Sequence, residues 1–145
     1  MLDWRRGSSV VVAVMGLSGC FSGNRASPTD ATPAVSLVDP AWRVTSIAGQ
    51  PVLSGTTITA EFSADERVAG SAGCNRYFGS AKATAGTIAM GPFGATLMAC
   101  SPDGVMTQEA RYLAALQAAK SYAISGDELR LGPTASETTL VFSSR

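Results

Sequence analysis

The stretch AGCNRYFGS, residues 72–80, sets a cysteine and an asparagine between glycines and leads into a candidate strand at residues 76–84. Glycines at 70, 73 and 79 are typical of tight bends or bulges, where a strand turns and another backbone comes close. Asn75 is suited to such a turn, because its side chain can bond nearby backbone groups. The stretch therefore predicts a bend before a strand, and it leaves open what the thiol of Cys74 does.

The chemistry open to Cys74 is limited by the rest of the chain, which has three cysteines and no histidine. A zinc or other soft-metal site needs several Cys or His ligands, so we expect no metal. A catalytic thiolate needs a base, most often His, and the chain offers none. In an exported protein a disulfide between Cys74 and Cys100 accounts for both residues, with two free buried thiols as the alternative.

Short segments of alternating polar and apolar residues fill most of the chain after residue 40. In residues 56–62, for example, Ile58, Ala60 and Phe62 share one face, which is the period of a half-buried strand. About eight such strands, separated by Gly, Pro, Ser and Asp turn signals, predict a mainly β fold, either a sandwich or a barrel. The other candidate strands are residues 41–49, 67–70, 76–84, 87–91, 96–100, 122–125, 128–131 and 138–142.

One segment interrupts this alternation and predicts an α-helix. Residues 105–120, VMTQEARYLAALQAAK, are dominated by Ala, Leu, Gln, Glu and Met, which are strong helix formers. Met106, Glu109, Leu113, Leu116 and Lys120 fall near one helical face. We expect Tyr112, Leu113 and Leu116 to pack against a sheet.

The amino terminus has the layout of a secretory signal peptide. Arg5 and Arg6 precede a short apolar run at residues 10–17, and small residues lead to Cys20. The run is much shorter than the roughly 20 apolar residues of a transmembrane helix. Residues 17–20, LSGC, resemble the lipobox of bacterial lipoproteins, in which a peptidase cuts before the cysteine and lipid is attached to it. The resemblance implies that residues 1–19 are removed and that Cys20 carries acyl chains such as palmitate.

A lipid anchor at Cys20 predicts a location. Two or more acyl chains hold a protein stably at a membrane, whereas one chain binds only marginally. Phe21 follows the cysteine and, by resemblance to the enterobacterial sorting pattern, is compatible with the outer membrane. Residues 20–39 are rich in Ser, Thr, Pro, Ala and Gly, so we expect a flexible tether. We therefore expect a lipid-anchored protein of the bacterial cell envelope, facing the periplasm.

Charge and spacing narrow the class of function. The 11 basic residues balance the 11 acidic ones. The sequence contains no run of Lys or Arg of the kind that binds nucleic acid, so we expect no nucleic-acid partner. Ser, Lys and Asp are present without the spacing of a nucleophile and its base. We therefore expect that the protein is not an enzyme and that it has no catalytic residue and no cofactor.

Several motifs occur in a characteristic order. Residues 68–79 contain the pattern G-C-N-x-(Y/F)-x-G, and residues 95–100 contain T-x-M-A-C. Trp42 precedes them, and the segments MTQE, YLAAL and GDELRL follow them. This combination resembles the META domain, the family of the HslJ heat-shock lipoprotein, over nearly all of residues 40–145. Leu97 is a departure, since members commonly carry Arg or Lys there.

The resemblance implies a compact, mostly antiparallel, barrel-like β domain with one helix across it. It also implies an envelope protein linked with stress tolerance, in a family with no associated catalytic activity. We expect this protein to bind another envelope protein or a cell-wall component. The candidate binding surface comprises Asn75, Arg76, Tyr77 and Phe78. Core packing is the alternative for Tyr77 and Phe78. The alternative function is a β-barrel carrier of a small hydrophobic ligand.

Overall fold

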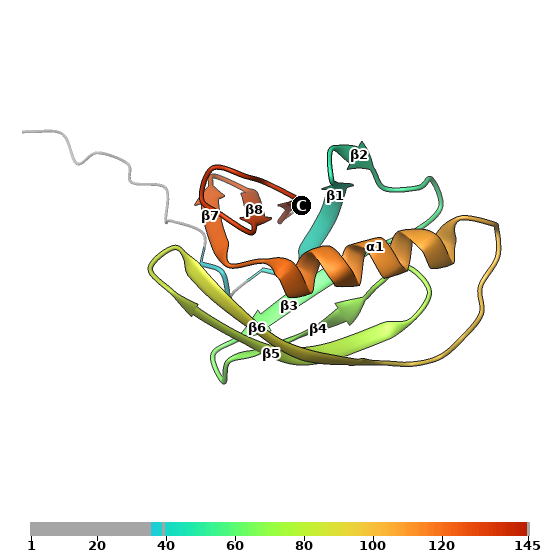
Figure 1. Ribbon diagram of the computed structural model, residues 1–145, viewed down its shortest axis with the longest axis horizontal. Helices are drawn as coiled ribbons and strands as arrows, with labels where there is room; N and C mark the ends of the chain where they lie inside the picture. Colours follow the sequence, from blue (N-terminus) through green and yellow to red (C-terminus); the bar gives the residue numbers. More distant parts are fainter. Residues whose placement is uncertain (1–35, 39, 145) are drawn as a thin grey trace, which may run out of the picture. The chain divides into compact units, whose positions relative to one another are not determined.

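The structure, a computed structural model, describes residues 36–38 and 40–144. The predicted signal peptide, Cys20 and Phe21 lie outside the described residues, as does the predicted tether apart from residues 36–38. The described part contains nine strands and one helix (Figure 1). They are β1 (Trp42–Ile47), β2 (Gln50–Pro51), β3 (Thr59–Ser63), β4 (Arg67–Ser71), β5 (Arg76–Thr84), β6 (Thr87–Ala95), α1 (Val105–Ala118), β7 (Ser121–Ser125), β8 (Glu128–Gly132) and β9 (Leu140–Ser143).

The strands form one antiparallel sheet that closes on itself. Their order is β2-β1-β3-β4-β5-β6-β7-β8-β9, and β9 also pairs with β1. This last pairing closes β1 and β3 to β9 into a barrel of eight strands, while β2 is an extra strand beside β1. Closure pairs strands that would otherwise be the edges of an open sheet. The mainly β, barrel-like fold with one helix is confirmed.

Alternation along the strands decides which side chains enter the barrel. In β3, Ala60 and Phe62 are buried whereas Glu61 and Ser63 are exposed, as the period of two predicts. In β1, Trp42 is fully buried, and its indole N–H donates to the Leu37 carbonyl oxygen at 2.9 Å. This bond gives the polar end of a core side chain a partner.

Helix α1 crosses the barrel (Figure 1), but its buried face differs from the predicted one. Tyr112 and Leu116 are buried and Leu113 packs partly buried against the core, as expected, and Glu109 of the predicted face is buried too. Met106 is 40% exposed, and Lys120 lies beyond the end of the helix. The buried face of the helix differs from the predicted one because polar side chains of the helix are buried where they form hydrogen bonds to loops. The buried residues are Val105, Gln108, Glu109, Tyr112 and Leu116.

The strand predicted at residues 96–100 is wrong. Strand β6 ends at Ala95, and the following residues form a loop that leads to α1. A side chain takes the backbone groups that a neighbouring strand would pair. The Met98 N–H donates to Asn75 Oδ1 at 2.7 Å, and Asn75 Nδ2 donates to the Met98 carbonyl oxygen at 3.1 Å.

Large side chains fill the interior of the barrel. Tyr77 and Tyr112 meet edge to face with ring centroids 5.6 Å apart, and Tyr112 packs similarly against Phe142 at 6.5 Å. The other large side chains with almost no exposed surface are Trp42, Ile58, Leu116, Leu129, Leu131, Leu140 and Val68.

The two buried tyrosines share a directed chain of hydrogen bonds. The Tyr77 hydroxyl donates to the Thr59 carbonyl oxygen at 2.9 Å and lies 2.7 Å from the Tyr112 hydroxyl. Because a carbonyl oxygen can only accept, the proton of Tyr77 is engaged with Thr59. The Tyr112 hydroxyl is therefore the donor to Tyr77.

The two phenylalanine variants should differ in stability. Tyr77→Phe leaves a buried donor and a carbonyl acceptor without this partner, so we expect a loss of about 2 kcal/mol in the free energy of unfolding. Tyr112→Phe removes only a donor, so we expect a loss of about 1 kcal/mol. Urea unfolding of both variants measures the difference. Equal losses, or a greater loss in Tyr112→Phe, would contradict the donor order.

Stability should also fall in strong alkali. Burial raises the pKa of Tyr77 and of Tyr112 above the ordinary value of 10.0, because a buried phenolate loses its hydration. The folded state then keeps protons that the unfolded state releases, so this contribution is complete below about pH 10 and is lost as the pH rises further. Unfolding curves and tyrosinate absorbance, recorded from pH 8 to about 12, test this. Ionisation of these tyrosines without loss of the fold would contradict it.

Candidate functional site

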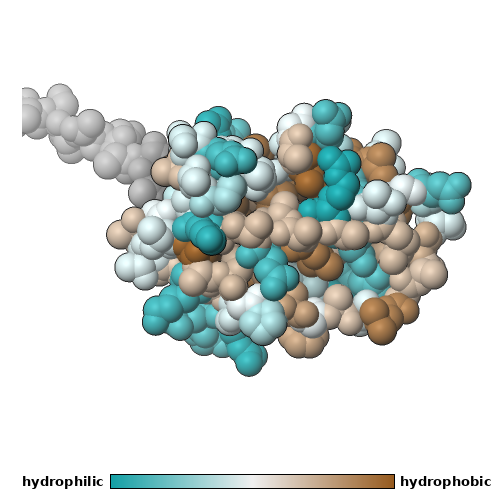
Figure 2. Space-filling view, viewed as in Figure 1, coloured by the Kyte–Doolittle hydropathy of each residue, from teal (hydrophilic) through white to brown (hydrophobic). Residues whose placement is uncertain are grey.

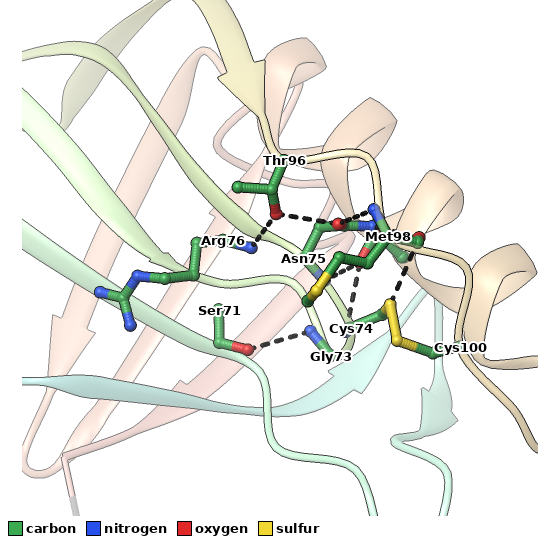
Figure 3. The surroundings of a disulfide bond; sticks show 9 residues. Ser71, Gly73, Cys74, Asn75, Arg76, Thr96, Met98 and Cys100 are labelled. Carbon is green, nitrogen blue, oxygen red and sulfur yellow. Dashed lines mark hydrogen bonds between the residues drawn. A yellow bond between two sulfur atoms is a disulfide. The ribbon is translucent and has the colours of Figure 1, made fainter.

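The structure joins Cys74 and Cys100 in a disulfide, as the sequence predicts (Figure 3). The bond connects the turn before β5 to the loop after β6, across a sequence separation of 26 residues. Two free thiols, the alternative left open by the sequence, are not what the structure contains. Neither sulfur is available as a nucleophile in this state.

Asn75, beside the disulfide, lies inside the protein and has only 2% of its surface exposed. Its Oδ1 accepts from the Met98 N–H at 2.7 Å and from Thr96 Oγ1 at 2.8 Å. Its Nδ2 donates to the Met98 carbonyl oxygen and, at 2.7 Å, to Glu109 Oε1. Both donors and both acceptor positions of the amide are used. Asn75 therefore fixes the loop after β6 against the turn before β5 (Figure 3).

Glu109 brings the helix into the same network. Its carboxylate accepts from the Asn75 backbone N–H at 2.7 Å, from the Cys74 N–H at 3.2 Å and from the Asn75 side chain. Glu109 is buried, with 6% of its surface exposed, so these donors replace the water that the carboxylate loses. The Asn75–Glu109 pair, together with the disulfide, joins β5, the loop and α1.

Gln108 makes a second connection from the helix. Its Oε1 accepts from the Leu53 N–H at 2.7 Å, and its Nε2 donates to Thr56 Oγ1 at 2.9 Å. Among the described residues, no buried side-chain nitrogen or oxygen lacks a hydrogen-bond partner. These groups are therefore committed to structure, and the site offers no unpaired buried acid or base.

The structure exposes only two of the four residues of the predicted binding surface. Asn75 and Tyr77 are 2% and 1% exposed, because they belong to the inward-facing side of the turn and of β5. They cannot contact a partner. Arg76 and Phe78 alternate with them and point outward, and Phe78 is 64% exposed. Figure 3 shows the Arg76 side chain directed away from the disulfide.

The outer side of β5 is shaped around Phe78. Its cross-strand neighbours are small, Ala69 on β4 and Gly94 on β6. A Cβ added at Gly94 would lie 2.7 Å from Cζ of Phe78, so the ring occupies the space above this glycine. The aromatic ring therefore rests on the sheet while much of its surface faces solvent.

The sequence did not identify a second exposed apolar segment, in the loop after β6. Leu97 is 98% exposed and Met98 is 54% exposed, although Asn75 and the disulfide hold this loop. The available signal was Leu97 itself, an apolar residue where the META family commonly carries a basic one. The loop thus presents apolar side chains from a fixed backbone.

The part of the chain that the structure describes shows neither a metal site nor a membrane-spanning helix. Residues 36–38 and 40–144 contain no group of three or more Cys, Asp or Glu residues arranged to hold a metal ion. The helix in this part is too short and too polar to cross a membrane.

Solved structures share the fold. A protein solved by NMR has a TM-score of 0.59 at 20% identity, covering 76% of this chain and 95% of its own. An NMR structure of a protein from Burkholderia xenovorans also has a TM-score of 0.59, at 28% identity, covering 75% of this chain and 83% of its own. A DUF4847 family protein from Bacteroides vulgatus has a TM-score of 0.56 at 17% identity, covering 75% and 94% respectively.

Family membership follows from the sequence match. No curated protein matches the chain. The META domain matches residues 35–145, which include all the described strands and the helix. The disulfide, the buried asparagine and the eight-stranded barrel lie within this range, and the chain belongs to the META domain family.

Proposed function

We propose that the protein is a non-enzymatic domain, anchored in the bacterial envelope by lipid on Cys20, that acts by binding. The partner is another envelope protein or a cell-wall component, and the binding supports stress tolerance. The observation that carries the proposal is Phe78, a large aromatic side chain that is 64% exposed on the outer side of β5.

The chemistry of the buried polar groups supports a role without catalysis. Both cysteines of the domain are in a disulfide, and the carboxylate of Glu109 is surrounded by donors from neighbouring segments. Burial raises the pKa of Tyr77 and of Tyr112, so these phenols form a phenolate even less readily than an exposed tyrosine does. The cysteines, the buried glutamate and the two buried tyrosines are therefore engaged within the fold.

The surroundings of Phe78 support a contact surface. A shallow cavity of about 290 Å³ lies beside the ring and is lined by residues of β4 and β5. Nearby charges are paired on the surface, with Lys82 3.3 Å from Glu66 and Arg67 3.7 Å from Asp65. Exposed ion pairs contribute little to binding, whereas aromatic and Arg side chains commonly dominate interfaces. Phe78 and Arg76 are of these two types.

The alternative, a carrier of a hydrophobic ligand inside the barrel, has less support. Tyr77, Tyr112, Phe142 and Trp42 occupy the interior, with at most 1% of their surface exposed. The cavities described for residues 36–38 and 40–144 open to the surface. We therefore place the binding function on the outside of the barrel.

Crosslinking in intact cells tests the proposal. A photo-crosslinking residue at Ser80, next to the cavity beside Phe78, should capture one defined envelope component. Phe78→Ser should reduce that capture by about tenfold while the domain remains folded, as its circular dichroism and a cooperative thermal transition would show. The matched control carries the crosslinker at Ala123, an exposed residue of β7. Identical products from the two positions, or capture that does not depend on Phe78, would contradict the proposal.

The anchor needs a separate test. Cys20→Ser should move the protein from the membrane fraction to the soluble fraction without changing the thermal midpoint of the folded domain. A variant protein that stays in the membrane fraction after residues 1–19 have been removed would contradict lipid attachment at Cys20.

A further inference from the structure

A groove separates the β1–β2 hairpin from helix α1, on a different part of the surface from Phe78. Its volume is about 470 Å³, within the range of roughly 300–1,000 Å³ in which proteins hold small ligands. Figure 1 shows β2 beside the first half of α1, and Figure 2 shows hydrophobic and hydrophilic side chains adjoining there.

The two walls of the groove differ in character. The helix wall is formed by Gly104, Thr107, Gln108 and Arg111, whose spacing of three and four residues puts them on one face. The facing wall is mainly apolar and consists of Ile47, Gln50, Pro51 and Leu53. Leu53 is 42% exposed, although it is a large apolar residue. The groove thus offers an apolar wall opposite a polar one.

Arg111 is the only charged residue of the eight that line the groove. Its guanidinium has no ion pair or hydrogen bond among the described residues. The same is true of Arg43 and Arg76, but neither of these lines the groove. The Gln108 side chain already accepts from the Leu53 N–H and donates to Thr56 Oγ1, and it is uncharged. Recognition of a charged group in the groove therefore falls to the guanidinium of Arg111, which matches a carboxylate in shape and charge.

We propose that this groove binds a small carboxylate with a single acyl chain, with the carboxylate on Arg111 and the chain against Leu53, Pro51 and Ile47. The charge of the lining selects an anion, and the apolar wall selects a hydrocarbon chain. A peptide fits less well as an added strand, because β2 is two residues long and Pro51 has no N–H to donate. This site is independent of the surface around Phe78.

Titration of the isotopically labelled full chain with octanoate, followed by amide NMR shifts, tests the proposal. We expect saturable shifts at Leu53, Gly104, Thr107 and Arg111. Octanol and octylammonium, which have the same chain, should bind about tenfold more weakly because they lack the anion. No saturable shift in the groove, or equal affinity for octylammonium, would overturn the proposal.

Two variants separate the roles of charge and chain. Arg111→Gln should lower the affinity for octanoate by about tenfold and leave that for octanol unchanged. Leu53→Ser should weaken both ligands, and Arg43→Gln, an exposed arginine on β1 outside the groove, should change neither. Unaltered octanoate affinity in Arg111→Gln would overturn the site. Tighter binding of acetyl-Leu-Leu than of octanoate would overturn the assignment to an acyl carboxylate.

Discussion

Glu109→Ala is expected to lower the free energy of unfolding by about 4 kcal/mol. The carboxylate accepts three hydrogen bonds, from the backbone N–H groups of Cys74 and Asn75 and from the Asn75 side chain. Alanine would leave these donors unpaired in a place where little water reaches. Bonds to a charged acceptor contribute roughly 1.5–3 kcal/mol each, and local relaxation recovers part of the loss.

The glutamine variant gives a graded comparison. Glu109→Gln keeps one carboxamide oxygen for the two backbone N–H groups, but it turns an NH₂ group toward Asn75 Nδ2. We expect a loss of about 2 kcal/mol, between wild type and alanine. Glu61→Ala, at an exposed position of β3, is the matched control and should change stability by less than about 0.5 kcal/mol. Chemical denaturation measures the free energy of unfolding of the alanine and glutamine variants and of the control. A loss in Glu109→Ala no larger than in the control would contradict the network.

Removing the disulfide should have the next largest effect. Cys74→Ala with Cys100→Ala opens a loop closed across 26 residues, so the unfolded chain gains conformational freedom. The chain-entropy relation gives a loss of about 3.5 kcal/mol in the free energy of unfolding. Asn75 still holds Met98 in this variant, so the fold should persist.

Reductant supplies the control for that variant. Wild-type protein in reductant should unfold at the same denaturant concentration as the double variant, which should not respond to reductant itself. Combining Glu109→Ala with the double variant should give a loss that differs from the sum, because both changes release the same loop. A wild-type midpoint unaffected by reductant, with the disulfide shown to be open, would contradict the stabilising role.

Local patterns predicted much of the fold. The alternation in residues 56–62 placed Ala60 and Phe62 inside the barrel, and the alanine-rich segment marked the helix. Closure by pairing β1 with β9 has no local signature, because Arg43 and Ser143 meet from opposite ends of the domain. The strand predicted at residues 96–100 was wrong for a related reason, since the backbone of Met98 pairs with the side chain of Asn75, a residue distant in sequence.

The candidate site was predicted in part. Glycines around Cys74 and the absence of histidine indicated a structural cysteine, and the structure contains the disulfide. Asn75 was correctly suited to bonding backbone groups, but its place on the binding surface was wrong because Glu109 and Met98 draw it inside. The signal for this network was a glutamate on the buried face of the predicted helix, a position that needs a partner distant in sequence.

We propose that lipid on Cys20 anchors the chain, while a disulfide between Cys74 and Cys100 joins two segments of the barrel. Intact mass analysis of the protein from its native membrane fraction, with thiol alkylation before and after reduction, tests both parts. We predict a chain that begins at Cys20, carries acyl groups there, and gains two alkyl groups only after reduction. An unmodified Cys20, or alkylation of Cys74 and Cys100 in the folded, unreduced protein, would contradict the account.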